Sequence, residues 1–358
     1  MTQIEQLFEI PPYSVKKVEK QALLVDQLNV LSSHHVSHCE PYRKIRRASN
    51  NENQTFSRVD EFPYLPVRLF KEFDLKSIPD SDVIKTLTSS GTTGSQVSKI
   101  FLDKETSRFQ TKALSCIVQD FIGKKRLPML IIDSAKVIKD RRLFSARGAG
   151  ILGMANFGYD HLYVLDTDMR LDLNLLKVFL EKHKDETILL FGFTFMIWQH
   201  FYREIAHSKT PIDLSHGILI HSGGWKKLAD EAVDPRTFGA KLKEACSLER
   251  VHNFYGMVEQ VGSVYMECEQ GHLHAPVFSD IVIRDPRNWS AVEIGQHGVI
   301  EVLSVLPHSY PGHVLLTEDM GEVLGEDDCP CGRQGKYFRV TGRIPKAEIR
   351  GCSDTYES

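Results

Sequence analysis

The 358-residue sequence lacks a charge imbalance and long apolar runs, and each absence excludes a class of protein. Its 44 Lys and Arg residues nearly balance its 47 Asp and Glu residues, and the formal net charge is −3. Such a charge provides no field that would attract nucleic acid or an anionic membrane surface. No apolar run approaches the roughly 20 residues that a membrane-spanning helix requires. The sequence therefore predicts neither a nucleic-acid partner nor a membrane span.

The sequence lacks a disulfide pattern, and its amino terminus lacks a targeting pattern. Seven cysteines, an odd number spread over a long chain, argue against a disulfide framework. Residues 1–6 contain no basic stretch leading into an apolar one, which argues against a secretory signal. The composition, 42% hydrophobic and 25% charged, is ordinary for a protein with a sizeable core. We predict a cytoplasmic protein with one large domain or two.

The middle of the chain alternates between apolar runs and helical patterns. Buried strands are predicted at four apolar runs, residues 129–132, 162–165, 188–191 and 218–220. Helices are predicted between some of them, at residues 171–183 and 196–207. Strand–helix alternation indicates an α/β fold with a mostly parallel sheet.

The two ends of the chain have different patterns. Residues 1–60 are predicted to be helical and then loose, and the pattern changes to hairpin strands after about residue 265. An aromatic block from Phe191 to Phe201 either lines an apolar substrate pocket or belongs to the core. Burial in the core is the favoured interpretation, because large apolar side chains are usually just buried.

The densest polar motif is a glycine loop between strands predicted at 83–87 and 100–102. It contains five hydroxyl side chains and two glycines in seven residues, with a lysine five residues later: Thr88, Ser89, Ser90, Gly91, Thr92, Thr93, Gly94 and Lys99. Glycines let successive N–H groups converge on anionic oxygens, hydroxyls add donors, and the lysine adds positive charge. A polyphosphate-binding loop and an ordinary Ser/Thr/Gly hairpin turn both fit this motif.

Two further turns follow predicted strands. Ser222, Gly223 and Gly224 come after the strand at 218–220, and Tyr255 and Gly256 end a strand that begins near residue 251. Ligands of parallel sheets bind at the carboxyl ends of strands, so both turns are candidate binding elements.

These motifs, in this order, resemble those of the adenylate-forming superfamily, which includes acyl-CoA synthetases, firefly luciferase and peptide-synthetase adenylation domains. Thr88–Lys99 resembles its phosphate loop, with Gly-Ser-Gln-Val-Ser-Lys in place of Gly-x-Pro-Lys. Tyr255-Gly256-Met257-Val258-Glu259 resembles the Tyr-Gly-x-Thr-Glu motif. The resemblance implies that ATP is bound, that Tyr255 faces adenine, and that Glu259 helps to hold Mg²⁺. It also implies that the backbone of Ser222-Gly223-Gly224 borders adenine.

The resemblance extends to the β-rich part of the chain. Leu315–Gly321 resembles the Thr-Gly-Asp-Leu-Gly motif, with Glu318 in place of its glycine, and implies that Asp319 binds the ribose hydroxyls. Gly342-Arg343 resembles the hinge before the small lid domain, which is predicted to be nearly absent. Three regions are expected. They are a helical extension at residues 1–60, an adenylation-like domain at residues 61–342 with a β-rich part at about 265–340, and a truncated lid at residues 343–358 that forms a carboxyl-terminal arm.

Within this superfamily, the glycine loop, the Cys-Pro-Cys-Gly-Arg element and the terminal segment around Cys352 are similar to the acyl-protein synthetases of bacterial luminescence. This similarity implies that a long-chain fatty acid and ATP form acyl-AMP and that the acyl group moves to Cys352. It also implies a reductase partner that makes the aldehyde for luciferase, and an acyl-transferase subunit in the same complex. A coenzyme A ligase of the phenylacetate type and a catalytically silent binding subunit are the alternatives.

Cysteine and histidine also form two clusters, Cys-x3-His-x-His and Cys-x-Cys. Their members are Cys268, His272, His274, Cys329 and Cys331. Structural zinc sites use four such ligands, which makes a zinc site one hypothesis. The Cys-x-Cys spacing is tighter than the usual two-residue spacing, so a buried Cys/His turn without metal is the favoured alternative.

Overall fold

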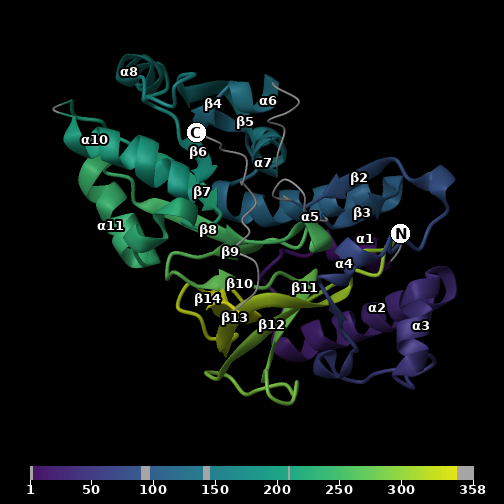
Figure 1. Ribbon diagram of the computed structural model, residues 1–358. Helices are drawn as coiled ribbons and strands as arrows, with labels where there is room; N and C mark the ends of the chain where they lie inside the picture. The colour runs from purple at the N-terminus through teal and green to yellow at the C-terminus, as the bar shows by residue number, and fades with distance from the viewer. Residues whose placement is uncertain (1–2, 90–96, 140–145, 209, 345–358) are drawn as a thin grey trace. The chain divides into compact units, whose positions relative to one another are not determined.

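The computed structural model describes residues 3–89, 97–139, 146–208 and 210–344 (Figure 1). Backbone contacts divide the chain into two compact units, one drawn from Met1–Phe121 and Gly256–Ile349 and the other from Ile122–Tyr255. The boundaries that the sequence suggests, at residues 60 and 342, stay predictions. Within the described ranges, no helix combines the length and the apolarity needed to cross a membrane.

The Ile122–Tyr255 unit contains a five-stranded parallel sheet. The strands are, in spatial order, β5 (Gly158–Leu165), β4 (Leu127–Ser134), β6 (Ile188–Phe193), β7 (Gly217–Ser222) and β8 (Arg250–Tyr255). All four apolar runs that the sequence marks as buried strands lie in this sheet. Strand β6 is buried along its whole length, as expected for an inner strand of a parallel sheet. The predicted α/β architecture is confirmed.

Helices connect these strands. They are α6 (Lys136–Lys139), α7 (Ala146–Ala155), α8 (Leu173–Lys182), α9 (Thr194–Met196), the π-helical turn η3 (Ile197–Tyr202), α10 (Arg203–His207), the 3₁₀ turn η4 (Lys226–Glu231) and α11 (Pro235–Cys246). The carboxylate of Asp172 accepts hydrogen bonds from two backbone N–H groups at the start of α8, and Asp234 does the same for α11. Phe191 and Phe201 are almost fully buried, so the aromatic block belongs to the core.

The other unit contains a mainly antiparallel sheet and a separate hairpin. The sheet strands are β11 (Ser279–Arg284), β12 (His297–Ser304), β13 (Val314–Glu326), β14 (Lys336–Arg343), β10 (Leu273–His274) and β9 (Tyr265–Glu267), in spatial order. Strand β1 (Leu65–Pro66) pairs in parallel with β13. The hairpin consists of β2 (Lys85–Thr88) and β3 (Lys99–Leu102). The change to hairpin strands after residue 265 is thus confirmed.

Most helical segments of the same unit come from its amino-terminal part. They are α1 (Gln3–Leu7), α2 (Lys17–His38), α3 (Glu40–Ala48), η1 (Val59–Glu61), α4 (Leu69–Glu72), η2 (Asp80–Asp82), α5 (Lys104–Ile122) and η5 (Val258–Gln260). Asp103 caps the start of α5, because the Thr106 backbone N–H donates to the Asp103 carboxylate over 2.7 Å. Helix α2 packs near the segment between β12 and β13, where His34 bonds to the carbonyl of His308 (Figure 1).

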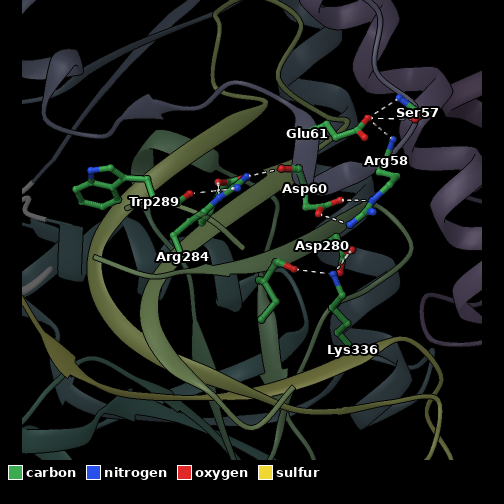
Figure 2. Close-up of polar contacts among 10 residues, drawn as sticks. Ser57, Arg58, Asp60, Glu61, Asp280, Arg284, Trp289 and Lys336 are labelled. Atoms are coloured by element: carbon green, nitrogen blue, oxygen red, sulfur yellow. Dashed lines mark hydrogen bonds and ion pairs between the residues drawn. The ribbon is translucent and has the colours of Figure 1, made fainter. Parts of the chain in front are cut away.

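A buried ionic network ties the η1 segment to the antiparallel sheet, as Figure 2 shows. The Arg284 guanidinium on β11 pairs with Glu301 on β12 over 2.6 Å and donates to the carbonyl of Asp60 over 2.8 Å. Lys336 on β14 pairs with Asp280 on β11 over 2.9 Å. Burial raises the pKa of Glu301 to about 7, and Arg284 opposes this rise. The Arg284 bond to Asp60 thus links the amino-terminal segment to β11, and loss of either partner of the Arg284–Glu301 pair would leave a costly buried charge.

Candidate functional site

The glycine loop is carried by a tight hairpin. Thr88 at the end of β2 lies directly opposite Lys99 at the start of β3. One step further into the loop, the Ser89 N–H donates to the Ser98 carbonyl over 3.1 Å, and the Ser98 N–H donates to Ser89 Oγ over 2.9 Å. These bonds close the neck of the loop. The other loop residues proposed to bind phosphate, Ser90, Gly91, Thr92, Thr93 and Gly94, lie outside the described residues.

Glu259 lies beside the neck of this hairpin. Its turn, η5, packs against β3, and its side chain is only 7% exposed. Burial raises the pKa of the Glu259 carboxyl, while the adjacent hydroxyl of fully buried Ser98 and the charge of Lys71 lower it and Glu318 raises it. The charged carboxylate is thus incompletely compensated by the protein. An oxygen-rich, acidic setting of this kind fits a magnesium ion, which prefers oxygen ligands.

The lysine proposed to contact phosphate has a different environment. Lys99 is about half-exposed, and its Nζ lies 3.3 Å from a carboxylate oxygen of Asp74. Lys71, on α4, instead acts electrostatically on Glu259. Sequence reasoning missed Lys71 and Ser98 as neighbours of Glu259, because this proximity depends on how α4, β3 and η5 pack together.

Asp319 and Arg343 form an ion pair across the β13–β14 ladder. The two residues are register partners, and Arg343 Nε lies 3.1 Å from Asp319 Oδ1. The Asp319 backbone N–H donates to Thr317 Oγ1, whose hydroxyl also donates to the carbonyl of Ile300 over 2.7 Å. The structure therefore joins two residues that the sequence assigned to separate motifs, and it orients Asp319 on a well-paired strand.

In the parallel sheet, the Ser222-Gly223-Gly224 turn follows β7 directly. Ser222 Oγ donates to the carbonyl of Phe254 on β8 over 2.9 Å. Gly223 has a φ of +86°, and a Cβ there would approach the Phe193 ring to 3.3 Å, so this turn requires glycine. Tyr255 ends β8, next to this turn, whereas Gly256 begins the segment assigned to the other compact unit. Ser222 and Tyr255 thus lie at the carboxyl ends of adjacent strands.

A buried ion pair that sequence reasoning missed lies at the end of β4. Asp133 Oδ2 lies 3.1 Å from Arg147 Nε, and neither side chain is more than 6% exposed. Burial raises the pKa of Asp133 to about 6, and Arg147 opposes this rise. The chain places β5 on one side of β4 and β6 on the other, and ligands bind at the strand ends of such a reversal. The only sequence signal was an aspartate directly after an apolar run.

Four of the five cysteine and histidine residues that the sequence grouped also come together. Ligand atoms of Cys268, His274, Cys329 and Cys331 all lie within 4.8 Å of one another. His272 is adjacent, with its Nδ1 3.4 Å from Cys329 Sγ, but it is not part of this group. Cys352 lies outside the described residues, so its role stays a prediction.

Comparison with known proteins identifies a family, a relative and two similar solved structures. The family model described as "Acyl-protein synthetase, LuxE" matches residues 2–358. The long-chain-fatty-acid–luciferin-component ligase of Vibrio harveyi is 24% identical over 307 residues, which cover 82% of this chain and 77% of that protein. An open conformation of 2-hydroxyisobutyryl-CoA ligase, bound to 2-HIB-AMP and CoA, has a TM-score of 0.70 at 16% identity and covers 95% of this chain and 78% of its own.

A second structure of that CoA ligase, in the postadenylation state, has a TM-score of 0.68 at 14% identity and covers 92% of this chain and 69% of its own. At such low identities the likeness concerns the fold alone. It confirms the adenylate-forming-enzyme-like α/β fold that the motif order predicts.

Proposed function

Because the chain belongs to the acyl-protein synthetase family LuxE, we propose that it activates a long-chain fatty acid with ATP and passes the acyl group to its own Cys352. The observation that carries this proposal is the family match, which extends over residues 2–358. The fatty-acid substrate is supported by the name of the Vibrio harveyi relative, a long-chain-fatty-acid–luciferin-component ligase.

The proposed reaction has two balanced steps. A fatty-acid carboxylate oxygen attacks the α-phosphorus of ATP, and the bond to pyrophosphate breaks. The thiolate of Cys352 then attacks the acyl carbon, and AMP leaves with the electron pair of the acyl–oxygen bond. The first step is needed because a carboxylate has no adequate leaving group, whereas AMP is a good one. Charge builds up on the phosphate oxygens during activation, so fixed positive charges and N–H donors there supply most of the catalysis.

The roles of the described residues follow from their positions. Glu259 and the hydroxyl of Ser98, at the neck of the glycine loop, would hold a magnesium ion, whose positive charge neutralises the phosphates when it is bound. The loop from Thr88 to Gly94 would bind the β- and γ-phosphates, and Lys99 would add positive charge. Asp319, oriented by Arg343 and Thr317, would accept hydrogen bonds from the ribose hydroxyls.

The second step defines the partners. A thioester on the protein must be consumed by an enzyme that accepts acyl groups, and we propose a reductase subunit that forms the aldehyde. An acyl-transferase subunit is proposed to supply the fatty acid within the same complex. Both partners rest on the family membership and not on a surface of this chain.

The decisive experiment is to incubate the protein with labelled fatty acid and ATP and to locate the label. We expect hydroxylamine-labile label on the wild-type protein. Cys352→Ser should lose this label while fatty-acid-dependent ATP–pyrophosphate exchange stays within about twofold, because the adenylation groups are unchanged. Cys246→Ser is the matched control, since that thiol is buried in α11.

Other outcomes of this experiment are equally informative. Label that appears only on added coenzyme A would identify a CoA ligase, and absence of exchange would identify a silent binding subunit. Thioester label that persists in Cys352→Ser would mean that another cysteine carries the acyl group.

The ribose assignment has its own test. Asp319→Asn is expected to raise the KM for ATP about tenfold and to change kcat little, because ribose contacts bind the ground state and the transition state alike. Asp285→Asn, a partly buried aspartate that follows β11 and pairs with Arg287, is the control. An unchanged KM for ATP in Asp319→Asn would remove this residue from the nucleotide site.

A further inference from the structure

A cluster of three cysteines and one histidine lies in the antiparallel unit, where the proposed reaction does not use it. Cys268 follows β9, His274 lies on β10, and Cys329 and Cys331 lie in the connection between β13 and β14. Cys268, His274 and Cys329 are buried, and Cys331 is half-buried. All four ligand atoms lie within 4.8 Å of one another.

Two distances within this cluster are close to those of a tetrahedral metal site. With Zn–S bonds of about 2.3 Å and Zn–N bonds of about 2.0–2.1 Å, neighbouring ligand atoms lie about 3.5–3.8 Å apart. Cys268 Sγ lies 4.0 Å from Cys329 Sγ, and Cys331 Sγ lies 3.4 Å from His274 Nε2. A disulfide bond between Cys268 and Cys329 would require the sulfurs to approach to about 2.05 Å. The arrangement therefore suits a shared ion better than a bond between two thiols.

The two cysteine-bearing turns have the same construction. In the first, the Gly271 N–H donates to the carbonyl of Cys268 over 2.9 Å, and in the second the Gly332 N–H donates to the carbonyl of Cys329 over 2.9 Å. Both glycines have positive φ angles, +76° and +84°, which other residues rarely adopt. The Gln270 N–H also points at Cys268 Sγ over 3.4 Å, an orientation that stabilises a thiolate. The two turns thus bring the three cysteine sulfurs into one cluster.

We propose that Cys268, His274, Cys329 and Cys331 bind one structural Zn²⁺ ion. All four ligand positions are filled by protein side chains, which is typical of a structural zinc site and leaves no position for a substrate. The half-buried Cys331 lines a surface cavity of about 690 Å³, which provides an entry path for the ion.

The ion would cross-link two hairpins. It would join the β9–β10 turn to the closed end of the β13–β14 hairpin, whose other end carries Asp319 and Arg343. Arg333, in the β13–β14 connection, already pairs with Glu269 of the β9–β10 turn at 3.0 Å. It also pairs with Asp120 on α5 at 2.9 Å. The zinc site would belong to this scaffold and would not depend on the reaction proposed above.

The test compares two histidines that are close in sequence. Wild-type protein purified without chelator or nickel is expected to contain about one zinc per chain by elemental analysis. His274→Gln should lose most of this zinc, whereas His272→Gln should keep it, because only His274 belongs to the four-ligand group. Cys331→Ser should lose zinc, and Cys116→Ser, a partly buried cysteine on α5, should not.

Cobalt provides a measurement that does not depend on the folding of a variant. Zinc-free wild-type protein titrated with Co²⁺ is expected to show the visible absorption of a tetrahedral cobalt–thiolate site at one equivalent. Wild-type protein with neither stoichiometric zinc nor this absorption would overturn the proposal. A folded His274→Gln variant with full zinc, or a Cys268–Cys329 disulfide in protein isolated from a reducing cytoplasm, would overturn it as well.

Discussion

Replacing Glu259 with glutamine is expected to lower fatty-acid-dependent ATP–pyrophosphate exchange about 100-fold or more, comparable with the loss of one preorganised electrostatic contact. The side chain keeps its size and its place beside Ser98, but it loses the negative charge that a magnesium ion requires. Since the charged Glu259 carboxylate is not fully compensated in the protein, the variant should be at least as stable as the wild type. Exchange kinetics and urea unfolding together measure both effects.

The control for this prediction is Glu322→Gln, a carboxylate on β13 that pairs with Arg339. It should keep normal exchange. If Glu259→Gln also kept normal exchange, Glu259 would not hold the metal, and the placement of the nucleotide at this hairpin would be wrong.

Two lysines, Lys99 and Lys71, are candidates for the positive charge that contacts phosphate in the activation step. Lys99→Ala is expected to raise the activation free energy of ATP–pyrophosphate exchange by about 2–4 kcal/mol, the loss from one preorganised electrostatic contact. Lys71→Ala is the structural rival, because Lys71 acts on Glu259 while Lys99 lies near Asp74. A large loss in Lys71→Ala together with normal exchange in Lys99→Ala would transfer the role to Lys71.

The second large effect is a loss of stability in mild acid. His35 on α2 and His313 before β13 are fully buried, and their rings lie 4.8 Å apart. Burial lowers the pKa of His313 to about 3, with Arg46 and His34 adding to the effect. Burial, together with His313, His34 and His308, holds the pKa of His35 well below its usual value, although its bond to the Pro307 carbonyl opposes this.

The sign of this effect follows from proton binding. Between about pH 6.5 and 3 the unfolded chain protonates these histidines while the folded protein does not, so the free energy of unfolding falls as the pH falls through this range. His313 alone should lower the free energy of unfolding by about 2 kcal/mol at pH 5 relative to pH 7.5. Urea unfolding at the two pH values and equal ionic strength measures the loss.

A neutral substitute isolates this contribution. His313→Gln keeps an amide nitrogen near Ser32 Oγ, which lies 3.0 Å from His313 Nε2, but it cannot be protonated. The difference in unfolding free energy between pH 7.5 and pH 5 should therefore shrink by about 2 kcal/mol. His207→Gln, on the exposed side of α10, should leave the difference unchanged. An unchanged difference in His313→Gln would mean that this histidine is not buried as a neutral ring.

Many strands of the fold were predictable, because local sequence patterns determine where they form. The four apolar runs lie in strands β4, β5, β6 and β7, as the sequence indicates. The separate hairpin around the glycine loop was also predictable, since two short apolar stretches flank a run of turn residues.

The candidate site was predictable only as a set of parts. The motif resemblance singled out Glu259 and Asp319 as candidates, but neither the Arg343 partner of Asp319 nor the position of Lys71 follows from spacing. The Asp133–Arg147 pair carries no motif at all, and only burial of both side chains at the end of β4 makes it notable. Such pairs form between different elements, and the distance between two elements along the chain does not predict whether they touch.

By itself, the sequence determined the class of fold, the absence of a charge suited to nucleic acid, and the residues available for chemistry. These properties depend on composition and on neighbours along the chain. The tertiary structure decided which of those residues meet: Glu259 with Ser98 at the neck of the hairpin, and His274 but not His272 with three cysteines. The physical reason is that strand register and side-chain direction, set by packing of distant segments, determine whether a carboxylate or imidazole faces a common centre.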